Sequence, residues 1–158
     1  MYFMYIIFNI LTQESTMSHR EKVAWLSLIA MAVTFVPYFA LMASGTLPLR
    51  PMPDLTRMGY FALTTIVQAI LLVAGHVALR LTAPDDARAP ADERDSAIAR
   101  KSVSAAYYVL MVGMIVVGCV MPFLHKGWDI VNAAIFMIVL AEVVHYGIAA
   151  VSYRRQAP

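Results

Sequence analysis

Two ionisable side chains, Glu142 and His145, lie inside an apolar stretch, residues 130–151, that is long enough to cross a bilayer. A charged group near the middle of a membrane helix costs roughly 2.5 kcal/mol or more, so such residues usually face protein or water rather than lipid. The sequence therefore predicts that the other helices of the chain enclose Glu142. Glu142-x-x-His145 also matches the Glu-x-x-His spacing with which helical bundles bind metal ions.

Three more polar side chains occur at depths that permit contact with this pair. Gln68 and His76 lie in a second apolar stretch, and Tyr108 lies near the start of a third. At 1.5 Å per residue, Glu142 and Gln68 lie about 14 Å and about 17 Å from the same side of the membrane. The histidines and Tyr108 lie nearer that side. We predict a candidate intramembrane polar cluster of Gln68, His76, Tyr108, Glu142 and His145.

The chemistry of this cluster has four interpretations. A protonated Glu142 can join helices through a hydrogen bond to Gln68 or a tyrosine. Glu142 and His145 can bind a transition metal, although the usual di-metal site needs further carboxylates. His76 and His145 can hold a haem as axial ligands. Glu142 and His145 can also relay protons or ions.

The composition places these residues in a membrane protein. Of the 158 residues, 61% are hydrophobic and 14% are charged, against about 45–50% and about 25% in soluble domains. The net charge of +2 gives no indication of nucleic-acid binding. A single cysteine, Cys119, excludes an intramolecular disulfide and a cysteine-based zinc site.

Hydrophobic length and turn residues predict an all-α membrane protein, a bundle of four transmembrane helices. A proline-rich loop is expected at 44–57, and a short hairpin at 125–129 should make the last two helices antiparallel neighbours. Residues 17–158 are expected to form one domain. The apolar part of residues 1–16 is too short to span, so we interpret that segment as an upstream extension or an interfacial segment. The predicted spans are 23–43, 58–79, 103–124 and 130–151.

The basic residues predict the orientation. Lys and Arg are enriched in cytoplasmic segments of membrane proteins. With both termini in the cytoplasm, nine of the twelve basic residues lie inside, which favours a multi-pass protein of the inner (plasma) membrane. The nine are Arg20, Lys22, Arg80, Arg88, Arg94, Arg100, Lys101, Arg154 and Arg155.

A charged motif, Asp92-Glu93-Arg94-Asp95, precedes the third span. Asp92 is suited to an N-cap, and Asp95 stands at the capping-box position three residues later. We expect a cytoplasmic helix that continues directly into the third span. With this motif, a short basic start and four spans, residues 18–155 resemble an uncharacterised family of small four-helix bacterial integral membrane proteins. The resemblance implies a fold and a compartment, and no chemistry.

The sequence favours a non-enzymatic interaction protein or subunit. It contains no nucleophile elbow, phosphate loop, HExxH or EF-hand pattern, which removes any positive case for an enzyme without excluding one. The expected partners are the lipid bilayer and a second copy or another membrane protein, with no nucleic acid, and no cofactor is predicted. The alternatives are a haem- or metal-binding redox protein using Glu142, His145 and His76, or a proton-coupled transporter.

Overall fold

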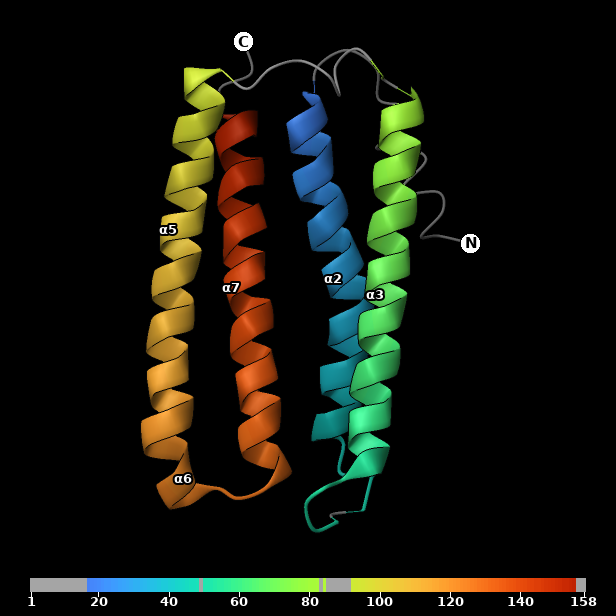
Figure 1. Cartoon of the computed structure of the whole chain (residues 1–158), viewed down its shortest axis with the longest axis vertical. Helices are drawn as coiled ribbons and strands as arrows, with labels where there is room; N and C mark the ends of the chain where they lie inside the picture. The colour runs from blue at the N-terminus through green and yellow to red at the C-terminus, as the bar shows by residue number, and fades with distance from the viewer. Residues whose placement is uncertain (1–16, 49, 83, 85–91, 156–158) are drawn as a thin grey trace.

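The computed structural model describes residues 17–48, 50–82, 84 and 92–155. The predicted extension at 1–16, and Arg88, lie outside these residues. Every described element is helical, and the helices run alternately up and down (Figure 1). The elements are α2 (His19–Ala43), α3 (Leu55–Thr82), α5 (Glu93–Ile115), a π-helical segment η1 (Val116–Val120), α6 (Met121–Leu124) and α7 (Trp128–Arg154).

Four helices in the described part of the chain are long and apolar enough to cross a membrane. They contain 25, 28, 32 and 27 residues, the third being the continuous run Glu93–Leu124. About 20 residues suffice to span the hydrocarbon core. The predicted fold class, an all-α membrane protein with four spanning helices, is confirmed. Each helix is longer than its predicted span, by about one to three turns.

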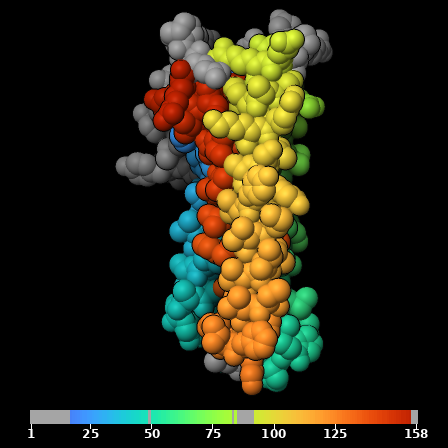
Figure 2. Space-filling view, turned by 90° about the vertical axis from the view of Figure 1, so that its left-hand side faces the viewer, coloured from blue at the N-terminus to red at the C-terminus, as the bar shows by residue number. Residues whose placement is uncertain are grey.

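The helices are ordered in space as α3, α2, α7 and α5. Extensive packing joins α3 to α2, α2 to α7 and α7 to α5. Seen from the α5 side, α2 and α7 lie to one side of α5 and α3 lies to the other (Figure 2). The share of buried residues in the apolar part of each helix agrees with this order. It is 33% in α2 and 22% in α7, but only 11% in α3 and in Glu93–Leu124. The bundle is therefore open, with α2 and α7 in the middle and α3 and α5 at the edges.

Close approach of the last two helices depends on Gly113. A Cβ atom at this position would lie 2.6 Å from the sulfur of Met137 on α7. The predicted antiparallel pairing of these helices is thus confirmed, with a small residue at the contact. Gly118, a second glycine suited to close packing, has no such neighbour among the described residues.

Helix α5 begins as the charged motif predicted. The Asp92 side chain accepts a hydrogen bond from the backbone N–H of Asp95, and the Asp95 side chain accepts one from the N–H of Asp92. This reciprocal pair is a capping box. The helix then runs without a break into the third span, so the predicted continuity is confirmed.

The π-helical segment has a local cause. Pro122 follows it and has no N–H to donate to the carbonyl four residues earlier. The N–H of Met121 instead donates to the carbonyl of Val116, five residues back. The wider turn accommodates the proline without ending the helix.

We call the end at which α2 begins and α7 ends the basic end, and the opposite end the loop end. Basic residues at the former include Arg20, Lys22, Arg80, Arg94, Arg100, Lys101, Arg154 and Arg155. The loop end holds the α2–α3 loop and the turn before α7 (Figure 1). In that turn Gly127 has φ +60°, a conformation that favours glycine.

The α2–α3 loop is shorter than predicted, because residues 55–57 form the first turn of α3. Asp54 explains the early start: its Oδ1 accepts a hydrogen bond from the N–H of Arg57 at 3.2 Å, as an N-cap does. The Arg57 guanidinium pairs with Asp54 at 3.3 Å and donates to the carbonyl of Leu47 at 3.2 Å. Likewise, the last helix begins at Trp128, inside the predicted hairpin.

Candidate functional site

Gln68 belongs to a polar contact between the first two spans. Its Oε1 lies 2.7 Å from Oγ1 of Thr34, and both side chains are buried. The Thr34 hydroxyl is also 2.9 Å from the carbonyl oxygen of Ala30, so its single hydrogen serves one acceptor at a time. The structure thus gives Gln68 a partner on α2 rather than Glu142.

His76 and Tyr108 lie apart from that contact. His76 is half-buried on α3, and its Nδ1 is 2.7 Å from the carbonyl oxygen of Leu72 in the same helix. Tyr108 is 61% exposed on α5 and stacks edge-on against Tyr107, with ring centroids 5.9 Å apart. No hydrogen bond, ion pair or ring contact within the described chain joins either residue to Glu142 or His145.

Glu142 is exposed near the middle of α7. It makes no hydrogen bond or ion pair within the part of the chain that the structure describes. The sequence predicted that the bundle would enclose this carboxyl group, and the structure differs. The reason is the open order of the helices, since α3 packs against α2 and has no extensive contact with α7.

His145 lines a pocket at the basic end, between α2, α5 and α7. The cavity has a volume of about 200 Å³ and is largely open. Nδ1 of His145 is buried and has no hydrogen-bond partner among the described residues. The ring of Tyr146 stands edge-on against that of His145, at 4.7 Å between centroids. The lining is Arg20, Val23 and Ala24 of α2, Ile98, Ala99 and Ser102 of α5, and His145, Tyr146, Ala149 and Tyr153 of α7.

Glu142 continues the pocket-lining face of α7 into the membrane. Residues 142, 145, 146, 149 and 153 are separated by three or four positions and fall within a sector of about 100°. Four of the five line the pocket, so the fifth, Glu142, lies one helical turn deeper on the same side. The structure therefore relates Glu142 and His145 to each other, and leaves Gln68, His76 and Tyr108 elsewhere.

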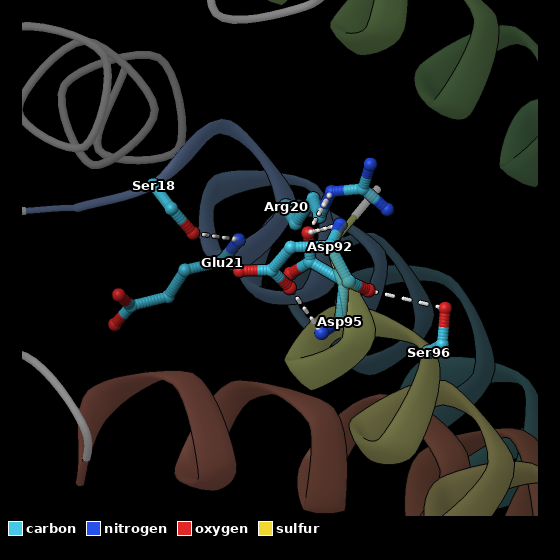
Figure 3. A network of polar contacts seen from close by, with 6 residues as sticks. All are labelled: Ser18, Arg20, Glu21, Asp92, Asp95 and Ser96. Atoms are coloured by element: carbon cyan, nitrogen blue, oxygen red, sulfur yellow. Dashed lines mark hydrogen bonds and ion pairs between the residues drawn. The ribbon is translucent and has the colours of Figure 1, made fainter. Parts of the chain in front are cut away.

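Arg20, which lines this pocket, forms an ion pair with Asp95 (Figure 3). Nε of Arg20 lies 3.3 Å from Oδ2 of Asp95, and the same oxygen accepts the capping hydrogen bond from Asp92 at 3.2 Å. Asp95 thus connects the first turn of α5 to the first turn of α2. Within the motif, Asp92 and Asp95 form the cap, and Asp95 also pairs with Arg20.

The rest of this pocket left weaker signals in the sequence. Tyr146 and Tyr153 follow Glu142 at helical spacing, and Arg20 belongs to the basic flank. The spacing along α7 was available from the sequence. The approach of Arg20 and Ser102 to that stripe depends on which helices are neighbours, which a single sequence does not specify.

Within the described residues, no group of three or more His, Cys, Asp or Glu side chains has an arrangement that could hold a metal ion. The residues that could support the metal and haem alternatives are therefore the pair Glu142-x-x-His145 and His76, which lies apart from that pair. No protein-family model, curated protein or solved structure matches the chain. The family resemblance stays a prediction that rests on the charged motif.

Proposed function

We propose that the protein is a non-enzymatic subunit of a homo-oligomer in a bacterial inner membrane, with its basic end in the cytoplasm. The observation that carries the proposal is Glu142, an exposed carboxyl group near the middle of a spanning helix that has no partner among the described residues. Facing lipid, this group is costly even when neutral, because it has no hydrogen-bond partner there. Association that gives it a partner recovers part of that cost.

A second copy of the chain is a suitable partner for chemical reasons. A protonated carboxyl group both donates and accepts hydrogen bonds, so two identical groups satisfy each other. A twofold axis brings the same residue from two subunits together. Ile138, one turn before Glu142, is 50% exposed and extends the surface available to a partner.

Cross-linking in membranes tests the proposal. In a Cys119→Ser background, Ile138→Cys should give a disulfide-linked dimer, and Glu142→Leu in that background should reduce the dimer several-fold. Val143→Leu, at an exposed neighbour of Glu142, is the matched control and should leave the yield unchanged. A cross-link to a different membrane protein would replace the second copy as partner, and equal yields with and without the Glu142→Leu substitution would refute the role of Glu142.

A proton-coupled transporter is the second candidate. Glu142 and the pocket-lining residues of α7 lie on one side of that helix. His145 lies between Glu142, at the deepest position, and Tyr153, at the outermost, as a proton relay would require. Glu142→Gln separates the two functions, because an amide keeps hydrogen-bonding capacity but cannot titrate. If the protein is a non-enzymatic subunit, the Glu142→Gln variant should retain both the dimer yield and the cellular phenotype. Retained dimers with a lost phenotype would favour proton transport.

A further inference from the structure

We propose that the pocket at the basic end binds the phosphate and glycerol of an anionic phospholipid. The site is distinct from the surface around Glu142 and does not depend on the dimer. It lies where α2 and α5 begin and α7 ends, which is the level of the lipid headgroups for helices of this length.

The size of the pocket suits the proposed group. A cavity of about 150 Å³ accepts benzene, so about 200 Å³ is large enough for glycerol phosphate. Because the cavity is largely open, the acyl chains can extend out of it. Val23, Ala24 and Ala149 provide apolar walls for the glycerol carbons and the first methylene groups.

The polar groups of the pocket are mostly donors. Arg20 uses Nε toward Asp95 and also hydrogen-bonds with the Tyr153 side chain, and its remaining guanidinium N–H groups are available to other acceptors. Its side chain is 41% exposed and therefore accessible from the rim. Tyr146 and Tyr153, which carry hydroxyl groups, also line the cavity. Phosphate oxygens are acceptors, and the planar fork of arginine matches their geometry.

Deeper in the pocket, the Nδ1 atom of His145 lacks a hydrogen-bond partner among the described residues. A buried polar atom without a hydrogen bond is destabilising, and its Nδ1 is such an atom within the described structure. A lipid whose phosphate lies at Arg20 places its glycerol ester groups below the rim, at the depth of this ring. An ester carbonyl can then accept a hydrogen bond from Nδ1–H.

The surrounding charge favours an anionic lipid. Arg100, Lys101, Arg154 and Arg155 are exposed at the same end. Basic pockets between membrane helices are sites at which anionic headgroups bind. Free phosphate would be attracted by the cations but would gain nothing from the apolar walls. A site that has both cations and apolar walls therefore favours a phospholipid.

Binding is measured on the full chain, delipidated in detergent, by the shift of the thermal unfolding midpoint with added short-chain lipid. Phosphatidylglycerol should raise the midpoint saturably, whereas phosphatidylcholine and inorganic phosphate at matched ionic strength should not. An equal shift with phosphatidylcholine would overturn the requirement for an anion. An equal shift with inorganic phosphate would overturn the lipid as its source.

Four variants locate the site. Arg20→Gln and the pocket-filling Ala149→Leu should each weaken phosphatidylglycerol binding at least tenfold. Arg154→Gln removes an exposed cation at the same end and should change binding less than twofold. Asp95→Asn breaks the ion pair but frees Arg20, so it should retain or strengthen binding.

The comparison of these variants decides the proposal. If Arg20→Gln and Arg154→Gln weaken binding equally, the lipid responds to net charge and the pocket is not its site. If Asp95→Asn weakens binding as much as Arg20→Gln, the ion pair acts through structure alone and the proposal fails. Unchanged binding in Ala149→Leu would overturn it as well.

Discussion

The two ends of the bundle each contain an arginine–aspartate pair with the same 3.3 Å separation, yet the pairs differ in sequence separation and in exposure. At the loop end, Asp54 and Arg57 are three residues apart, and their side chains are 1% and 7% exposed. At the basic end, Arg20 and Asp95 come from different helices, and their side chains are 41% and 18% exposed. Distance alone therefore says little about what an ion pair does.

The difference between the pairs is one of surroundings. The loop-end pair is desolvated and supported by bonds to the Arg57 N–H and the Leu47 carbonyl, so removing one partner leaves a buried charge. The basic-end pair is screened by water and worth little in free energy. The first pair fixes a turn, and the second positions two helices beside a pocket.

The largest effect is expected at the loop end. Arg57→Met leaves Asp54 buried without its partner and should destabilise the protein by about 3–5 kcal/mol. Thermal unfolding in detergent measures the loss. The double variant Asp54→Asn, Arg57→Met is the control, since it removes both charges and should recover most of the stability. No recovery would show that the pair contributes through more than its charges.

An intermediate effect is expected at the start of α5. Asp92→Ala removes the N-cap and should cost about 1 kcal/mol. Hydrogen exchange should accelerate across residues 93–99 while the spanning helices remain protected. Fast exchange there in the wild-type protein would contradict a stable helical start.

The smallest effect is expected for the basic-end pair itself. A double-mutant cycle of Arg20→Gln and Asp95→Asn should give a coupling of about 0.2–1 kcal/mol, which weakens as salt is added. A coupling above about 2 kcal/mol that resists salt would erase the contrast between the two ends.

Local patterns were sufficient for much of this fold. Apolar length specified the four spanning helices, and the spacing of Asp92 and Asp95 specified the cap that begins α5. These features depend on residues a few positions apart. The charge bias that predicts a cytoplasmic basic end is of the same kind and stays a prediction.

The site depended on long-range order instead. Depth placed Gln68 and Glu142 at similar levels, but Gln68 contacts Thr34 because α3 packs against α2. Helices in lipid are apolar on several faces, so periodicity does not identify the neighbour that each face meets. The place of Arg20 in the pocket likewise depends on which helices are neighbours. From the sequence, its charge indicated only the orientation in the membrane.

The spatial order α3–α2–α7–α5 has a consequence for the connectivity of the chain. Two of the native connections join helices that are neighbours, whereas the connection from α3 to α5 joins the two edges of the bundle. The start of α2 and the end of α7 belong to packed helices and lie at the same end (Figure 1). A circular permutant that links residue 155 to residue 17 and opens between α3 and α5 would read α5–α7–α2–α3, so that every connection becomes a hairpin between packed helices and the contact order falls.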